Sequence, residues 1–504
     1  MRSMMALHPR TKKEKIGGVG RPAIKWVISA LFLIGFNISG FAAYHHKGEI
    51  DSAYFLEAYP DKAGTKLDSC AQCHTGGSYD SGGKAVALGS CQWCHYKYGY
   101  DAIGNIDDTL NPYGMAYKAN GRSSIALRKI EGQDSDADGY SNKTELDALR
   151  FPGDGNDDLS KVPAPFRVFS RQLIENLPRH TQLLLMNAHK STDFYAKYTG
   201  VSMEEILQAA GALATATHIN VYAPDGFSQY HPMNPDPNPL FYHVRGAYPA
   251  AAYHYREAAD TAKNKDGWCD YGRVAGMNLE NNSRIENKDG LKLMLAYQRD
   301  TQYLDAGTLA PNNKLDGEGP FRVVPPQKKP GPPDQRSTAR DQRVIWPFDP
   351  DADHNAGYSI RTATFVKVEP LPAGTTDIDM REAGWKYVDE GKIVVYGAIH
   401  PGPTIIFKLD ALIETMDSCG AKTYKNLLYK KLLVFEAYAA QKLAKWGNYK
   451  AARSILQKGI LEHVDGCSTN GGGIDKDDWV TDCELQKKIY WDLHELIVLF
   501  GIIV

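Results

Sequence analysis

The chain has 504 residues, of which 43% are hydrophobic and 23% charged, and its formal net charge is only −2. This length is enough for two to four folded domains, each with a core of its own. The near-neutral balance gives no reason to expect nucleic acid or an anionic membrane surface as a partner.

The N-terminus has the pattern of an export signal. Basic residues within 10–25 precede an apolar run at 26–43, which ends in small residues at Gly40 and Ala42. A charged head, an apolar stretch and small residues are typical of a secretory signal, cleaved here after Ala42. The alternative is an uncleaved anchor, because the run approaches the roughly 20 residues that span a bilayer. Either interpretation predicts a periplasmic, membrane-anchored or extracellular protein, with residues 1–43 as signal peptide or anchor.

Two copies of the motif Cys-x-x-Cys-His follow, at 70–74 and 91–95. In such a motif the two thiols bind the vinyl groups of a haem, and the histidine becomes an axial iron ligand. Two haems c are therefore expected on Cys70, Cys73, Cys91 and Cys94, with His74 and His95 on the irons. A zinc site made by the four thiolates is the alternative. Histidine after both second cysteines, in an exported chain, favours haem.

The motifs do not fix the sixth iron ligands. His45 and His46, just after the expected cleavage site, are the first candidates and Met115 is the second, while His180 and His189 are weaker ones. Two histidines on one iron would lower its reduction potential relative to a histidine and a methionine. The short separation of the motifs predicts neighbouring haems, an arrangement that suits stepwise electron transfer.

Residues 134–145 match the calcium-loop pattern D-x-D-x-D-G-x5-E in full. Carboxylates are hard oxygen ligands, the glycine permits the sharp turn, and the following residue offers its backbone carbonyl. The expected calcium ligands are Asp134, Asp136, Asp138, Tyr140, Asn142 and Glu145. Helical sequence flanks the loop at 114–129 and 142–150. The alternative interpretation is a solvated acidic turn.

These elements together resemble a known group of domains. Residues 50–156 combine a haem motif, Asn-Pro-Tyr-Gly at 111–114, the calcium turn and Phe-Pro-Gly-Asp at 151–154. This combination resembles exported bacterial cytochrome domains and implies a small α-helical cytochrome c domain at 44–165. The second haem motif departs from the single one that such domains often carry, so their iron ligands are not transferred to positions here.

The middle of the chain, 166–400, has a different pattern of elements. They are a helix at 198–211, a strand and turn at 217–228, Leu-Ala-Tyr at 295–297, Gly-Pro-Phe-Arg-Val-Val-Pro at 319–325, and a strand at 360–368. Their order resembles the molybdopterin-binding domain of the sulfite oxidase family and implies a mixed α/β fold. Asn187 stands near the position of the family's molybdenum-binding cysteine. We therefore expect the fold without molybdopterin.

Residues 401–504 have helical periodicity, with a turn at 447–450, Asp-Gly-Cys at 465–467 and Asp-Lys-Asp-Asp-Trp at 475–479. About residues 425–500 resemble a small helical module at the C-termini of varied exported bacterial proteins. The resemblance implies a helical bundle with a structural Cys467–Cys483 disulfide, worth roughly 3 kcal/mol in the chain-entropy model. By elimination, a second disulfide is expected between Cys269 and Cys419.

The sequence thus predicts a multidomain α+β protein: an exported dihaem c-type cytochrome that transfers electrons between redox partner proteins. One alternative is a haem-linked molybdopterin oxidoreductase of the sulfite oxidase type that acts on a small oxyanion. The other is a binding or assembly module on the cell surface. The missing molybdenum cysteine favours the electron carrier over the enzyme, and no catalytic residue is identified.

Overall fold

The computed structural model divides the chain into residues 1–38 and 39–504, and every described residue belongs to the second unit. The structure describes residues 49–81, 84–90, 105–188, 193–235, 241–255, 269–270, 279–280, 283–311, 314–330, 333, 335–338, 341–344, 353–379, 384–469 and 472–504. The expected export signal, His45, His46, the second haem motif and His189 lie outside these ranges. Within them, no helix combines the length and the apolar character that crossing a membrane requires. The mixed α+β class is confirmed.

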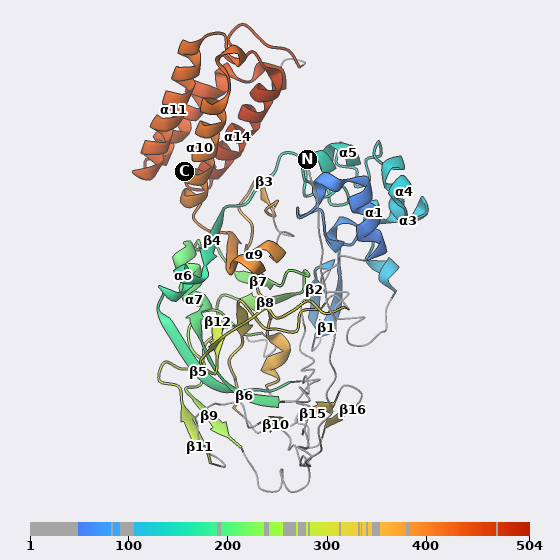
Figure 1. Cartoon of the computed structure of the whole chain (residues 1–504), viewed down its shortest axis with the longest axis vertical. Helices are drawn as coiled ribbons and strands as arrows, with labels where there is room; N and C mark the ends of the chain where they lie inside the picture. Colours follow the sequence, from blue (N-terminus) through green and yellow to red (C-terminus); the bar gives the residue numbers. More distant parts are fainter. Residues whose placement is uncertain are drawn as a thin grey trace, which may run out of the picture. The chain divides into compact units, whose positions relative to one another are not determined.

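The first described region is helical (Figure 1). Its elements are α1 (Ile50–Ala58), η1 (Pro60–Lys62), η2 (Cys70–Gln72), the hairpin β1 (Gly77–Ser81) and β2 (Lys84–Leu88), η4 (Ile106–Thr109), α3 (Pro112–Ala119), α4 (Ser124–Lys129) and α5 (Asn142–Asp147). One core includes Phe55, Tyr113, Leu127 and Leu146. The helix predicted at 114–129 is two helices, because Gly121 and Arg122 adopt positive φ and Ser123 caps α4.

Two sheets dominate the middle of the chain. One has six strands: β5 (Arg179–Met186), β6 (Asp193–Ser202), β10 (Cys269–Asp270), β12 (Met294–Arg299), β13 (Gln302–Tyr303) and β14 (Arg322–Val324). The other has the order β4 (Phe166–Ser170), β19 (Lys392–Gly397), β17 (Phe365–Glu369), β7 (His218–Tyr222) and β8 (Ser228–Pro232). A single core takes side chains from both sheets and from α7 (Met203–Ala210).

Smaller elements complete this region. They are the strand pairs β3 (Val162–Pro163) with β18 (Thr375–Thr376), β9 (Ala251–His254) with β11 (Ser283–Glu286), and β15 (Gln335–Thr338) with β16 (Asp341–Val344), and the helices α6 (Arg171–Glu175), η5 (Asn355–Tyr358) and α9 (Gly384–Glu390). The helix predicted at 198–211 begins only at Met203, because the preceding residues belong to β6. There, a Cβ on Gly200 would lie 2.0 Å from the Leu295 carbonyl oxygen of β12.

The C-terminal region is a helical bundle. Figure 1 shows α10 (Gly402–Ser418), α11 (Leu427–Lys445) and α14 (Cys483–Gly501) side by side. Between them along the chain are η7 (Ala421–Thr423), α12 (Tyr449–Ile455), the π-helical turn η8 (Leu456–Ile460), η9 (Leu461–His463) and α13 (Gly466–Thr469). The predicted Cys467–Cys483 disulfide is formed, with Cα atoms 5.6 Å apart.

The disulfide expected between Cys269 and Cys419 is not formed. Cys269 is buried in β10, within a core cluster that includes Leu185 and Tyr195. Cys419 follows α10 and packs against the core of the helical bundle. Because a disulfide requires Cα atoms closer than about 7 Å, two cysteines held in separate cores cannot form one. The pairing by elimination was therefore wrong.

Candidate functional site

The first haem motif is held against the segment that precedes α3. Cys70 to Gln72 form η2, and the chain then runs antiparallel to residues 109–111. The Thr75 N–H donates to the Thr109 carbonyl at 2.9 Å, and the Asn111 N–H donates to the Cys73 carbonyl at 2.9 Å. These backbone hydrogen bonds fix His74 beside Thr109.

The hydrogen bonds of Thr109 determine the tautomer of His74. The Thr109 hydroxyl donates to the Ile106 carbonyl at 2.6 Å, and His74 Nδ1 lies 2.6 Å from the same hydroxyl oxygen. A hydroxyl has only one proton to donate, so the Nδ1–H of His74 is the donor in the second bond. With this direction of hydrogen bonding, the lone pair of the imidazole is on Nε2.

The Asn-Pro-Tyr-Gly segment packs directly on the haem motif. The Asn111 side chain accepts from the Gly114 N–H at 2.8 Å and donates to the Gln72 carbonyl at 3.2 Å. A Cβ on Gly114 would lie 2.2 Å from the Cys73 carbonyl oxygen, and one on Gly153 would lie 2.5 Å from Asn111 Cγ. The two glycines are thus required by close backbone packing around the motif.

The cysteines of the first motif are partly buried, and burial raises the pKa of the Cys73 thiol to about 12. At neutral pH this side chain carries the S–H that adds across a vinyl group when a haem thioether forms. Of the candidate sixth ligands, Met115 lies on α3 and is 54% exposed. His180 is buried in β5, where its Nε2 is bonded to Gln182 Oε1 at 3.1 Å.

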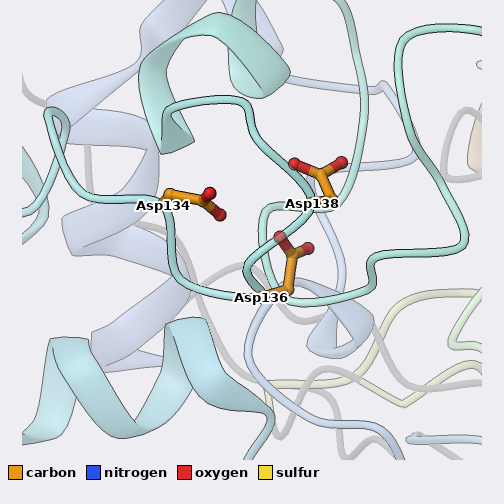
Figure 2. Close-up of side chains that lie close together, drawn as sticks. All are labelled: Asp134, Asp136 and Asp138. Carbon is orange, nitrogen blue, oxygen red and sulfur yellow. The ribbon is translucent and has the colours of Figure 1, made fainter.

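The three aspartates of the predicted calcium loop come together. One carboxylate oxygen from each of Asp134, Asp136 and Asp138 lies within 4.8 Å of the others. Figure 2 shows the three side chains on one loop, with the Asp134 carboxylate directed across it. The loop is shaped by Gly139, which has φ of +100° and donates its N–H to Asp134 Oδ2 at 3.0 Å. The motif therefore produces the turn that its glycine predicts.

Glu145, the last ligand of the pattern, is the most informative residue of this site. It lies on α5 and is fully buried, and neither of its carboxylate oxygens has a hydrogen-bond partner among the described residues. Burial, together with the nearby Asp136 and Asp138, raises the pKa of Glu145 to about 9. A buried carboxylate without a partner is unfavourable. A calcium ion would satisfy it, so the residues present fit the metal.

The other two expected calcium ligands have different surroundings. Asn142 is fully buried; its Oδ1 accepts from the Ser135 N–H at 3.2 Å and its Nδ2 donates to the Ile130 carbonyl at 2.7 Å. Its side chain therefore organises the loop. Tyr140 is 39% exposed, and its expected contribution is only its backbone carbonyl.

Asn187 stands near the position at which the resemblance would place a molybdenum-binding cysteine. Asn187 is buried, its N–H donates to Asn355 Oδ1 at 2.8 Å, and its carbonyl accepts from the Ala356 N–H at 3.0 Å. Its own Oδ1 has no hydrogen-bond partner within the described part of the chain. A neutral amide oxygen is not equivalent to a thiolate as a metal ligand, so Asn187 itself does not supply a sulfur ligand.

A buried charge cluster in the same region could not be anticipated from the sequence. Arg322 Nη1 lies 2.5 Å from Glu318 Oε2, and Arg299 pairs with the other oxygen of Glu318. Although burial opposes ionisation, Arg322 and Arg299 lower the pKa of Glu318 to about 2. Burial and the neighbouring Arg322 lower the pKa of Arg361 to about 10. A protein carboxylate thus already occupies the centre of this arginine cluster.

Comparisons of the chain with known protein families, curated proteins and solved structures find no match.

Proposed function

We propose that the chain is an exported dihaem c-type cytochrome that transfers electrons between redox partner proteins. The observation that carries this proposal is the repeated Cys-x-x-Cys-His motif, whose first copy is held with His74 Nδ1 2.6 Å from the Thr109 hydroxyl oxygen. A haem bound there would supply reversible one-electron chemistry at iron. The chain's own residues would attach it, orient the axial ligand and exclude water.

Each residue of the first motif has a separate task in this proposal. Cys70 and Cys73 would hold the haem covalently, and His74 would bind its iron. Thr109, which is only 2% exposed, would keep the imidazole in one orientation and one tautomer. The second haem is proposed on Cys91, Cys94 and His95 from the repeated motif alone.

Calcium has a structural task in the same proposal. Asp134, Asp136, Asp138 and Glu145 would bind one ion between α4 and α5. Ile130 before the loop and Leu146 after Glu145 are both fully buried in the core that also contains Tyr113 and partly buried Cys73. An ion that neutralises Glu145 would therefore stabilise the core on which the haem motif packs.

The first experiment measures haem, iron, calcium and zinc per chain, on protein from a host that matures c-type haem. The expected result is two haems and one calcium per chain. Replacing Cys70 and Cys73 with alanine should remove one haem, and so should replacing Cys91 and Cys94. One zinc and no haem would overturn the proposal in favour of the tetrathiolate alternative.

A second experiment tests the role of Thr109. Thr109→Val removes the acceptor of the His74 Nδ1–H, so we expect a shifted reduction potential and a changed visible spectrum while the haem stays attached. The matched control is Thr75→Val, which alters the neighbouring threonine, whose side chain bonds only the Thr109 carbonyl, at 3.3 Å. Equal spectra and potentials for the two variants would contradict the assigned tautomer.

A further inference from the structure

One face of α11 in the C-terminal bundle combines exposed apolar side chains with lysines. The residues of this basic aromatic face are Leu428, Lys431, Phe435, Tyr438, Lys442 and Trp446. At 100° per residue they fall within an arc of about 80° around the helix axis. Their spacing therefore places all six on one side of the helix.

The apolar members of this face are far more exposed than large hydrophobic side chains usually are. Leu428 is 63% exposed, Phe435 67%, Tyr438 49% and Trp446 77%. The opposite side of α11 is buried against the bundle through Leu433, Ala437, Ala440 and Ala444. The helix is thus apolar on two sides, and only one of them is covered. A cluster of exposed apolar side chains of this kind marks an interaction surface.

Charge is strongly segregated along the sequence of this part of the chain. Residues 420–460 contain nine lysines and arginines and a single carboxylate, whereas residues 461–484 contain seven carboxylates and one lysine. The carboxylate of the first stretch, Glu436, is turned towards Gly459, where a Cβ would meet its Oε2. Within the described residues, Lys431 and Lys442 form no ion pair. The near-neutral net charge of the whole chain therefore includes a basic stretch of sequence at 420–460, which contributes Lys431 and Lys442 to this face.

We propose that the basic aromatic face of α11 binds an anionic phospholipid membrane surface. Leucine, phenylalanine, tyrosine and tryptophan side chains enter the boundary between headgroups and acyl chains, while lysines meet the phosphates. Each lysine near such a surface contributes about 1 kcal/mol, or roughly fivefold in affinity. The helix would lie in the plane of the interface and would not span the bilayer.

The charge distribution favours lipid over a protein occupant. Lysine is depleted in protein–protein interfaces, and here it alternates with the apolar residues. In a two-fold dimer the same face of each copy would meet the other, which would place lysines against lysines. An anionic bilayer neutralises all of them at once, and its interface accepts aromatic side chains without a matching shape.

The test compares binding of the full-length chain to phosphatidylcholine vesicles with and without 30% phosphatidylglycerol. Binding is expected to be stronger with phosphatidylglycerol than without it, and the difference should shrink as salt rises. Lys431→Glu with Lys442→Glu should weaken it by about 30-fold or more, and Phe435→Ser with Trp446→Ser by a similar factor. The matched control is Ile125→Ser with Lys129→Glu on α4, where Ile125 is 77% exposed; it should bind as the unaltered chain does. All variants share residues 26–43, so any anchoring by that segment is common to them.

A second readout reports on Trp446 itself. Lipids brominated in the acyl chain should quench part of the tryptophan fluorescence, and Trp446→Phe should remove most of that quenching. Equal quenching in the two chains would overturn the proposal, as would equal binding of the Lys431/Lys442 variant and the α4 control. Light scattering that shows a dimer, lost in the Phe435/Trp446 variant, would assign the face to a second copy and would also overturn it.

Discussion

Two acidic turns of this chain look alike in composition but differ in how their carboxylates are satisfied. In each turn three aspartates bring oxygens within 4.8 Å: Asp134, Asp136 and Asp138 in the first, and Asp465, Asp475 and Asp478 in the second. In the second, buried Asp478 accepts from the Gly466 N–H at 3.2 Å and from the Asp475 N–H at 2.7 Å. In the first, buried Glu145 has no partner among the described residues.

This difference shows why an acidic cluster alone does not identify a cation site. The backbone of the second turn already neutralises its buried carboxylate, and the Cys467–Cys483 disulfide closes the turn covalently. In the first turn no disulfide is present among the described residues, and backbone N–H groups bond Asp134 and Asp138 but leave buried Glu145 without a partner. We infer that calcium does for the first turn what the backbone and the disulfide do for the second.

The largest expected effect is the stabilisation of the fold by calcium, which we expect to depend on the first acidic turn and not on the second. Calcium at about a thousand times its dissociation constant should raise the free energy of unfolding by about 4 kcal/mol. Glu145→Gln should remove most of this gain, because the amide cannot give the ion a charged bidentate ligand. Thermal unfolding in calcium and in chelator measures this stabilisation by calcium. Asp147→Asn, on the exposed side of the same helix, is the control and should keep the gain; a loss in both variants would break the comparison.

The second effect concerns the Cys467–Cys483 disulfide, which closes the second turn. Replacing Cys467 and Cys483 with serine should lower the free energy of unfolding by roughly 3 kcal/mol, because the open loop gains entropy in the unfolded chain. Chemical denaturation with and without calcium measures the contribution of the disulfide and that of calcium to the free energy of unfolding. The gain in this free energy on adding calcium should be the same in the serine variant as in the unaltered chain. If the loss of the disulfide also abolished the calcium response, the ion would belong to the second turn.

A smaller effect is expected for Asp478→Asn. The new amide turns a donor towards one of the two backbone N–H groups that Asp478 now satisfies, at a cost of about 1–3 kcal/mol. A lower denaturant midpoint, with no change in the dependence of the unfolding free energy on denaturant concentration, would measure this loss of stability. The calcium titration of this variant should match that of the unaltered chain. A weakened calcium affinity would show that Asp478 is a metal ligand after all.

The smallest effect is a pH dependence at Asp465. Burial and the nearby Asp475 and Asp478 raise the pKa of its carboxyl above the usual 3.8. The folded chain then holds this proton more tightly than the unfolded chain, so stability falls as pH rises through the window above 3.8. Asp465→Asn removes that loss, and we expect it to be slightly the more stable at pH 7. Its advantage in melting temperature should shrink towards pH 4; a constant advantage would contradict the assignment.

Sequence patterns predicted the features that depend on neighbours along the chain. The acidic turn around Gly139 and the periodicity of α11 follow from spacing within short segments, and the Cys467–Cys483 disulfide is the one that the resemblance of the C-terminal region implied. The failures had tertiary causes. The helix predicted from residue 198 was partly strand, because residues 198–201 pair with β12. The Cys269–Cys419 disulfide failed because each cysteine packs in a different core.

The candidate haem and calcium sites also combine features that are local in the sequence with features that depend on tertiary contacts. The sequence alone identified the candidate residues for haem and calcium, because ligand type and spacing are local properties. Only the tertiary structure brought Thr109 to His74 and left Glu145 buried without a partner. It also turned Glu436 inward, so that the lysines and aromatic side chains of α11 share a face with no carboxylate among them. The physical reason is that burial and hydrogen bonding across the fold decide which of these groups still needs a partner.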